Sequence, residues 1–503
     1  MDYNQAVSKA EERFEKLRKT VGLVLGPAVF LLLYLLPLEG LTPEAKKLSA
    51  ILGIVLVFWL TEAAPIPVTA LLGAALCVLF NVAPAQEVLA PFANPIVFLF
   101  IGSLMLAEAI SAHGLDKRFA FAIFSFRFLQ RSPARALFAV GAITAGISMW
   151  ISNTAAAAMI FPVALGALGG MKEMRRDGFD FKRYSTAMML MVAYGASVGG
   201  LATPIGTPPN LIGIGMIERF TGVRISFFEW MVFALPMTMV MFFYLFFILG
   251  VSKSFGRLEL SGVDAYVKKA REKLGAWNRG EKNTALCFAV AIILWILPSV
   301  FELSLGKEAA FPRFLSGRLN EGVVALVAAL LLFFLPVSFK DRVFTLSWER
   351  AVKIDWGTIL LFGGGLSLGG LMFSTGLAGK IGSTLTMLTG ATTLWTITSI
   401  AIALGITLSE TTSNTASANM AIPVMIALAN GAGVSPLPPA LGACLGASFG
   451  FMLPVSTPPN AIVYASGLVP ITSMVKKGIL FDVGGFFVIL FWLMLACPLM
   501  GWS

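Results

Sequence analysis

Long runs of apolar residues without charge are the feature that most constrains the fold of this chain. Residues 20–38 and 284–301 contain no Asp, Glu, Lys or Arg, and further apolar runs recur towards the C-terminus. A helix of about 20 apolar residues spans the hydrocarbon core of a bilayer. Of the 503 residues, 57% are hydrophobic and 13% are charged, which is about half the charged fraction of a soluble domain. We therefore predict an all-α polytopic membrane protein.

The positive charge of the chain lies mainly between these apolar runs. The formal net charge is +10, and residues 251–283 are especially rich in Lys and Arg. Cytoplasmic loops of membrane proteins are enriched in both residue types, so the charge gives no reason to expect a nucleic-acid partner. This map predicts about 11 transmembrane helices in a plasma membrane (the bacterial inner membrane), with the N-terminus cytoplasmic and the C-terminus outside.

A short polar string interrupts two of the apolar segments. Residues 148–158 and 409–419 share the pattern Ser-x-x-x-Ser-Asn-Thr-Ala, and basic residues flank the first segment, 136–171, on both sides. If both flanks are cytoplasmic, the segment enters and leaves on one face. Each arm of about 15 residues then reaches about 22 Å into a core about 30 Å thick. We predict a re-entrant hairpin at 136–171 and a second one, opening to the outside, at 388–430.

A second string follows each hairpin. Residues 204–210 read Pro-Ile-Gly-Thr-Pro-Pro-Asn, and residues 454–460 read Pro-Val-Ser-Thr-Pro-Pro-Asn. Thr caps helices and Pro suits the first helical turn, so we predict broken helices at 184–217 and 437–469. Non-helical backbone at membrane depth is tolerated only where it is buried in protein or lines a cavity. Two repeated breaks therefore indicate a binding site.

The two halves of the chain align beyond these strings. Ile96–Leu115 aligns with Thr358–Leu377, with identical residues at positions that include Phe100 and Phe362. Because the predicted hairpins open to opposite faces, the halves form an inverted repeat. Inverted repeats whose broken helices meet near the midplane are typical of secondary transporters.

The chemistry of the breaks favours an anion together with a small cation. Free N–H groups and the dipole at a half-helix N-terminus attract anions, and hydroxyl and carbonyl oxygens suit sodium. The segments 136–171, 184–217 and 381–475 contain one charged residue, Glu410. A bound anion would therefore lack an arginine partner, and a buried charge without compensation is unfavourable. Co-bound sodium would supply the countercharge.

The paired hairpin tips, the paired Thr-Pro-Pro breaks and the inverted repeat resemble the divalent anion/sodium symporter (DASS) family over about residues 45–503. The resemblance implies an elevator-type homodimer in membrane lipid, with a scaffold part and a moving transport part. It also implies sodium-coupled uptake of C4-dicarboxylates (succinate, malate or fumarate) or of related di- and tricarboxylates such as citrate. Sodium would be co-transported, and no organic cofactor, catalytic residue or enzyme activity is expected.

The resemblance also assigns the site residues. The first sodium site would consist of Ser148, Ser152, Asn153 and the carbonyl of Gly206. The second sodium site would consist of Ser409, Ser413, Asn414 and the carbonyl of Ser456. The substrate site would consist of Asn153, Thr154, Thr207, Ser413, Asn414, Thr415, Thr457 and Pro458.

These predictions divide the chain into six parts. They are a cytoplasmic N-terminal helix (1–19), scaffold spans with an interfacial helix (20–135), the first transport part (136–250), a cytoplasmic loop (251–283), further scaffold spans (284–387) and the second transport part (388–503).

Several alternatives stay open at this point. Within the family, sodium-independent dicarboxylate or 2-oxoglutarate exchange and sulfate transport are alternatives to symport. Paired occluding hairpins suit alternating access better than a channel, and the spans offer few acids and one histidine, His113, to an intramembrane enzyme. Glu410 has two interpretations: it tunes the cation site beside Ser409, or it faces water on the hairpin flank.

Overall fold

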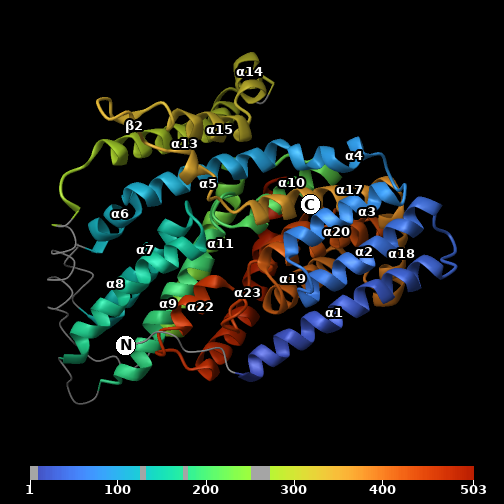
Figure 1. Cartoon of the computed structure of the whole chain (residues 1–503), viewed down its shortest axis with the longest axis horizontal. Coiled ribbons are helices and arrows are strands. Elements are labelled where there is room, and N and C mark those ends of the chain that lie inside the picture. The colour runs from blue at the N-terminus through green and yellow to red at the C-terminus, as the bar shows by residue number, and fades with distance from the viewer. Residues whose placement is uncertain are drawn as a thin grey trace.

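The computed structural model of the chain is a helical bundle with one pair of short strands among the residues it describes (Figure 1). The structure describes residues 9–124, 132–173, 179–250, 272, 274–306 and 308–502. The predicted N-terminal helix is therefore described from Lys9 and the predicted interfacial helix as far as Phe124. Most of the predicted loop 251–283 lies outside the described residues.

The chain begins with a long helix that carries both polar and apolar residues. α1 (Lys9–Leu35) runs without a break through residue 19, so the predicted surface helix and the first span are continuous. α2 (Pro43–Thr61) packs along α1, and Arg18 and Glu62 form an ion pair of 3.1 Å between them. The chain then forms α3 (Ile66–Leu79), α4 (Ala85–Leu89), the 3₁₀ helix η1 (Ala90–Ala93), α5 (Pro95–His113) and α6 (Leu115–Phe124).

The first predicted hairpin and the first predicted broken helix follow. They consist of α7 (Pro133–Ser148), α8 (Asn153–Glu173), α9 (Phe181–Gly200), α10 (Pro208–Thr221) and the long α11 (Phe227–Gly250). α7 and α8 pack on each other and on α9. Pro at the first turns of α7 and α10 suits helix starts, because the missing N–H would have no partner there.

The middle of the chain supplies a further series of helices and the two strands. They are α13 (Arg279–Leu305), α14 (Ala310–Arg318), α15 (Glu321–Leu331), the antiparallel strands β1 (Pro336–Ser338) and β2 (Val343–Phe344), α16 (Trp348–Ala351), α17 (Trp356–Ser374) and α18 (Leu377–Thr389). A capping box of Asn278 and Glu281 starts α13. The Glu281 carboxylate also accepts from Arg118 at 2.9 Å, which ties α13 to α6.

The last part of the chain repeats an order of elements seen earlier. It consists of α19 (Leu394–Thr411), α20 (Asn414–Gly431), α21 (Leu437–Gly446), α22 (Pro458–Tyr464) and α23 (Ile471–Leu499). The series α17–α23 has the order of α5–α11: a span, a shorter helix, a hairpin, a broken helix and a long final helix. This order agrees with the internal repeat in the sequence.

The two repeats interlock through their broken helices. α10 packs against α20 and α21 of the second repeat, and α22 packs against α8 and α9 of the first. At one crossing the Cys444 thiol donates to the carbonyl of Pro209 at 3.1 Å, and a Cβ on Gly213 would lie 2.4 Å from the Cys444 sulfur. In Figure 1 the second hairpin and α23 lie between α1–α3 and α7–α9. The hairpins and broken helices thus form one packed body.

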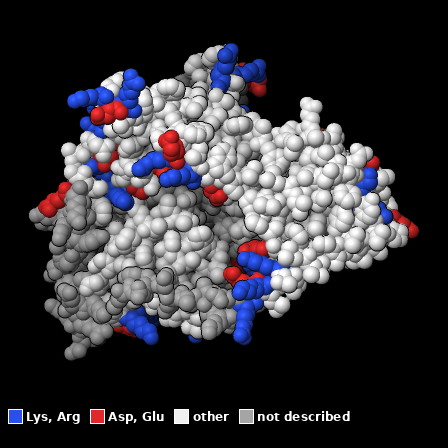
Figure 2. Space-filling view, in the orientation of Figure 1, with Lys and Arg blue, Asp and Glu red and all other residues white. Residues whose placement is uncertain are grey.

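Several helices have the length and composition of membrane spans. Within the described residues, seven helices are long and apolar enough to cross a bilayer, or up to eight if α14 and α15, bent by 58°, form one span. The apolar helices α3, α7 and α21 and the apolar part of α8, Asn153–Gly169, are shorter. Figure 2 shows a broad surface without charged side chains over the right-hand part of the molecule, with charges at its two ends. The expected count of 11 spans stays a prediction.

Candidate substrate and cation site

The tip of the first hairpin is a tight turn stabilised by its own polar side chains. α7 ends at Ser148 and α8 begins at Asn153. The Ser148 hydroxyl donates to Oδ1 of Asn153 at 2.7 Å, and the Ser152 hydroxyl accepts from the Ala155 N–H at 3.2 Å. Because the Ser148 proton points at Asn153, the two lone pairs of its oxygen stay available for a cation.

The tip of the second hairpin has the same bonds. The Ser409 hydroxyl donates to Oδ1 of Asn414 at 2.7 Å, and the Ser413 hydroxyl accepts from the Ala416 N–H at 3.2 Å. Ser413 is the N-cap of α20, as expected for Ser before a first helical turn. The repeated string therefore encodes the same local structure twice.

The break between α9 and α10 is held by one buried amide. Nδ2 of Asn210 donates to the carbonyls of Gly200 at 2.9 Å, Leu201 at 3.3 Å and Thr203 at 2.8 Å. The carbonyls of Gly200 and Leu201 lie where α9 ends, so no further helical turn supplies their partners. The Asn210 amide serves both carbonyls and the carbonyl of Thr203, and the Trp230 indole also donates to Leu201 at 3.2 Å, which keeps the non-helical segment compact.

The break between α21 and α22 has an equivalent amide. Nδ2 of Asn460 donates to the carbonyls of Gly450 and Leu453, each at 3.0 Å. Thr207 and Thr457 precede α10 and α22 with nearly equal backbone angles, φ −147° and −143°. Neither threonine side chain caps its helix, contrary to the expectation from sequence. Both hydroxyl groups therefore remain available for other partners.

In each repeat, one glycine allows the hairpin tip to approach the break of the broken helix closely. A Cβ on Gly200 would lie 2.4 Å from Oδ1 of Asn153 and 3.1 Å from the carbonyl oxygen of Gly206. A Cβ on Gly450 would lie 3.1 Å from Cβ of Ser456 and 3.2 Å from the carbonyl oxygen of Ser409. In each repeat, residues of the predicted sodium site from the tip and from the break thus lie around one glycine.

The predicted residues differ in exposure. Those that are buried are Ser148, Gly206, Thr207, Ser409, Ser456 and Thr457. Those that are half-buried are Asn153, Ser413, Asn414 and Thr415. Those that are exposed are Ser152, Thr154 and Pro458. Half of the predicted sodium residues are therefore buried, whereas several predicted substrate residues reach an accessible surface.

Both breaks contain buried oxygens without a hydrogen-bond partner among the described residues. These atoms are Oδ1 of Asn210, Oδ1 of Asn460 and Oγ1 of Thr457. Buried polar atoms in folded proteins nearly always have a partner, so an orphaned oxygen needs an explanation such as a water or an ion. The equivalent asparagine oxygen thus lacks a partner at the same place in both repeats.

Glu410 distinguishes the second site from the first. Its side chain is 7% exposed, so the water-facing interpretation is wrong. Oε1 accepts from the N–H groups of Phe451 at 2.5 Å and Met452 at 2.8 Å, and Oε2 accepts from the Ser456 hydroxyl at 2.7 Å. The carboxylate thus organises the second break. The equivalent place beside Ser148 is occupied by Met149, whose carbonyl accepts from the Thr203 hydroxyl at 2.5 Å.

Three residues of this region had not been assigned from sequence. Asn210 and Asn460 end the repeated Thr-Pro-Pro-Asn strings, and that repetition was an available signal for them. Asp482 is an acid in the last apolar run, and it lies beside Glu410. An ionisable residue inside a span is a functional candidate by default, so the sequence did carry a signal for Asp482.

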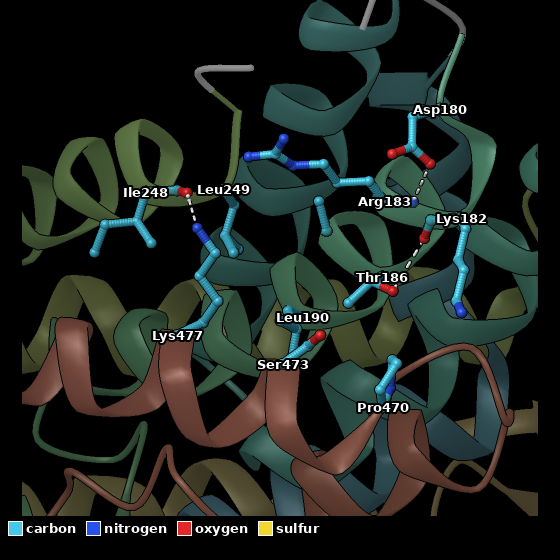
Figure 3. A pocket seen from close by; sticks show the side chains of 11 residues that line it. Asp180, Lys182, Arg183, Thr186, Leu190, Ile248, Leu249, Pro470, Ser473 and Lys477 are labelled. Carbon is cyan, nitrogen blue, oxygen red and sulfur yellow. Dashed lines mark hydrogen bonds between the residues drawn. The ribbon is translucent and has the colours of Figure 1, made fainter. Parts of the chain in front are cut away.

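A separate polar cavity of about 310 Å³ lies between α9, α11 and α23 (Figure 3). Lys182 and Arg183 of α9 and Lys477 of α23 line it, and the Lys477 ammonium donates to the carbonyl of Ile248 at 2.9 Å. None of the predicted sodium or substrate residues is among the residues that line this cavity. It is therefore distinct from the paired breaks.

The fold and the site together define a class of protein. Repeated hairpins and broken helices within a bundle of apolar helices are the architecture of a secondary transporter. The molecule is an integral membrane transporter built from two repeats.

Comparison with known proteins identifies its family. Residues 17–502 match the family model described as the sodium:sulfate symporter transmembrane region. The chain belongs to this family, the DASS family that the sequence motifs predicted. It is 32% identical over 477 residues, covering 94% of this chain and 90% of the relative, to the sodium-dependent dicarboxylate transporter SdcS of Staphylococcus saprophyticus. It is 31% identical over 472 residues, covering 91% and 87%, to SdcS of Staphylococcus aureus.

Two solved structures share the fold. The YdaH transporter of Alcanivorax borkumensis aligns with a TM-score of 0.55 at 12% identity, over 83% of this chain and 88% of its own. MtrF of Neisseria gonorrhoeae, described as one of a class of antimetabolite efflux pumps, aligns with a TM-score of 0.54 at 12% identity, over 95% and 94%. At this identity the likeness concerns the fold alone, which is a helical transporter fold as predicted.

Proposed function

We propose that this protein couples the entry of sodium to the uptake of C4-dicarboxylates such as succinate, malate or fumarate, or of related di- and tricarboxylates. The observation that carries the proposal is the pair of matching breaks whose polar groups include no Lys or Arg. A two-headed anion suits two such sites. The relatives of 31–32% identity, named sodium-dependent dicarboxylate transporters, support the same substrate class.

Sodium supplies the positive charge that the side chains of the site lack. The first sodium ion is bound by Ser148, Ser152, Asn153 and the carbonyl of Gly206. The second is bound by Ser409, Ser413, Asn414 and the carbonyl of Ser456. Unwound backbone carbonyls at broken helices are known sodium ligands in transporters. Because an unpaired buried anion is unfavourable, substrate binds well only after sodium.

The substrate lies between the two tips. One carboxylate meets the Asn153 amide, Thr154 and Thr207, and the other meets Ser413, the Asn414 amide, Thr415, Thr457 and Pro458. In support, Oδ1 of each tip asparagine already accepts a serine hydroxyl, which orients the amide as a whole. The Nδ2 group of the same side chain is a donor suited to a carboxylate.

The transport step is an elevator movement of the hairpins and broken helices against the scaffold. In support, α17 presents glycines to the moving elements: a Cβ on Gly365 would overlap the Asn419 side chain of α20, and a Cβ on Gly369 would lie 2.8 Å from the Phe220 ring. Small residues allow close approach of membrane helices. Two protomers form a dimer in lipid, with the N-terminus cytoplasmic and the C-terminus outside.

The test is uptake of labelled succinate into proteoliposomes with and without an inward sodium gradient. Accumulation that requires the gradient supports symport. Uptake that occurs only against internal dicarboxylate, and that ignores sodium, overturns symport and favours exchange of dicarboxylates such as 2-oxoglutarate.

Sulfate is the second candidate substrate, because the description of the matching family names it. Labelled sulfate is therefore measured beside labelled succinate in the same vesicles. Sodium-driven sulfate uptake that succinate does not inhibit would replace the dicarboxylate assignment.

A further inference from the structure

The polar cavity between α9, α11 and α23 lies where these three helices begin or end. α9 begins at Phe181, α11 ends at Gly250 and α23 begins at Ile471. α11 and α23 are long and apolar enough to span a bilayer. The 24 residues of α11 rise by about 36 Å, only slightly more than the hydrocarbon core of about 30 Å. The ends of these helices, and the cavity between them, therefore lie near the level of the lipid headgroups.

The side chains that line this cavity carry an excess of positive charge. Lys182, Arg183 and Lys477 are the cations among them, and Asp180 is the one acid. The Asp180 carboxylate already accepts from the main-chain N–H of Arg183 at 3.0 Å, as the N-cap of α9. Figure 3 shows the Arg183 and Lys477 side chains extending towards the same part of the cavity, beside Leu249. This part of the cavity is suited to an anion.

Most donors of the three cations have no acceptor among the described residues. An ammonium group has three N–H donors, and that of Lys477 gives one to the carbonyl of Ile248 at 2.9 Å. The side chains of Lys182 and Arg183 make no hydrogen bond, and none of the three cations forms an ion pair, within the part of the chain that the structure describes. Like charges around one cavity repel each other, so an anion between them is stabilising.

Apolar side chains complete the cavity and continue onto the outer surface of the molecule. Leu249 lines the cavity, and Phe247 on the same helix is 65% exposed. Leu480, about one turn after Lys477 on α23, is 48% exposed. Its carbonyl accepts from the Tyr244 hydroxyl of α11 at 2.7 Å, so the two helices run side by side there. The cationic part of the cavity thus adjoins an apolar surface on both spans.

This combination favours a phosphate group that carries acyl chains. Arg binds phosphate oxygens through two parallel N–H···O bonds, and Lys adds a compact charge. The volume of about 310 Å³ is at the lower end of the range of ligand pockets, about 300–1,000 Å³. Basic pockets between membrane helices are known to bind anionic lipid headgroups. A soluble anion would use the cations but leave the apolar surface without a role.

We propose that this cavity binds the phosphate group of an anionic phospholipid. Arg183 and Lys477 contact the phosphate oxygens, the exposed Lys182 adds positive charge, and the acyl chains lie along the outer surface of α11 and α23. α9 and α11 belong to the first repeat and α23 belongs to the second, so the bound lipid joins the two repeats. The proposal does not depend on the transported substrate, because no residue of the cavity belongs to the proposed sodium or substrate sites.

Native mass spectrometry of the purified protein in detergent tests the site. Phosphatidylglycerol and phosphatidylcholine with the same acyl chains are titrated into wild type, Arg183→Gln, Lys477→Gln and the control Lys476→Gln. Lys476 is the exposed neighbour of Lys477 and does not line the cavity. Wild type and Lys476→Gln are expected to prefer phosphatidylglycerol by at least about tenfold, the factor that about 1.4 kcal/mol gives. Arg183→Gln and Lys477→Gln should each lose most of this preference. Equal binding of both lipids to wild type, or an unchanged preference in either variant, overturns the proposal.

Thermal unfolding distinguishes a lipid from a free anion. A ligand that binds only the folded protein raises its unfolding temperature, so phosphatidylglycerol should stabilise wild type and Lys476→Gln more than Arg183→Gln. Inorganic phosphate and glycerol phosphate, which lack acyl chains, should not stabilise wild type at the same concentration and ionic strength. If either protects as well as phosphatidylglycerol, the ligand is a soluble anion and the lipid proposal is overturned. If Lys477→Gln does not fold, Arg183→Gln, at an exposed position, decides the result.

Discussion

The first and second breaks have the same local geometry but differ in how they are held together. In both, a serine hydroxyl donates to a tip asparagine at 2.7 Å, and a buried asparagine amide ties the carbonyls of the break. The first break relies on neutral groups, with Met149 beside Ser148. The second has Glu410 beside Ser409, with three donors around its carboxylate.

The difference shows that a duplicated motif can keep the residues of its proposed binding site while the groups that hold those residues in place diverge. The ligands are fixed by short strings, whereas the support comes from segments far apart in the chain. A neutral support responds little to pH or charge, but a buried carboxylate responds to every change of charge nearby. We therefore expect the two sites to respond equally to loss of ligands and unequally to changes in support.

The largest expected effect is loss of the tip asparagines. Asn153→Ala and Asn414→Ala each remove a proposed ligand and the acceptor of a serine hydroxyl. Uptake should fall by at least about a hundredfold in both, since even a supporting contact to a metal is worth up to about that factor. Proteoliposome uptake measures the effect, and the thermal unfolding temperature shows whether each variant folds. Wild-type transport in both variants would refute the site assignment.

Replacement of Glu410 should impair the second site, whereas a matched replacement in the first repeat should have little effect. In Glu410→Gln an NH₂ group replaces one carboxylate oxygen, so a donor faces groups that also donate. The substitution also removes the charge, and hydrogen bonds to charged groups contribute about 1.5–3 kcal/mol each. We expect a clear loss of thermal stability and weaker sodium activation of uptake. The matched control is Met149→Leu at the equivalent position of the first hairpin, where a volume-conserving change costs less than about 1.5 kcal/mol. Equal effects of the two substitutions would show that the two breaks do not differ in how they are supported.

Substitution of the glycines between tip and break should affect the first site more strongly than the second. In Gly200→Ala the new Cβ would lie 2.4 Å from Oδ1 of Asn153, whereas in Gly450→Ala its nearest contacts are at 3.1 Å. Overpacking of this kind costs about 1–3 kcal/mol, so Gly200→Ala should impair sodium activation more strongly. Sodium titration of uptake in both variants decides the point, and a stronger effect of Gly450→Ala would show that the first site relaxes more easily.

The smallest expected difference concerns the asparagines of the breaks. Asn210→Ala removes three hydrogen bonds and Asn460→Ala removes two. Since a hydrogen bond contributes about 1 kcal/mol net, the first substitution should destabilise by about 1 kcal/mol more than the second. Thermal unfolding in one detergent measures both. A larger loss of stability for Asn460→Ala would mean that the hydrogen bonds of Glu410 depend on Asn460.

Much of the fold could be predicted because its signals are local. The helix pairs α7–α8 and α19–α20 lie where the hairpins at 136–171 and 388–430 were predicted, and the breaks fall at the Thr-Pro-Pro strings. The re-entrant course of the hairpins stays a prediction. The continuity of α1 through residue 19 could not be predicted, because charged residues are equally compatible with a helix end and with a helix that leaves the membrane. The threonine side chains at 207 and 457 likewise precede helices without capping them.

By itself the sequence determined the membrane class, the repeat and the two strings that bear the proposed ligands. Those features follow from run length, composition and short-range order, which a chain keeps in any tertiary context. Only the tertiary structure decided that Glu410 is buried, that its carboxylate collects the backbone of the second break, and that Asp482 of α23 lies beside it. The physical reason is that a buried charge is governed by whichever groups the packing of distant helices places around it.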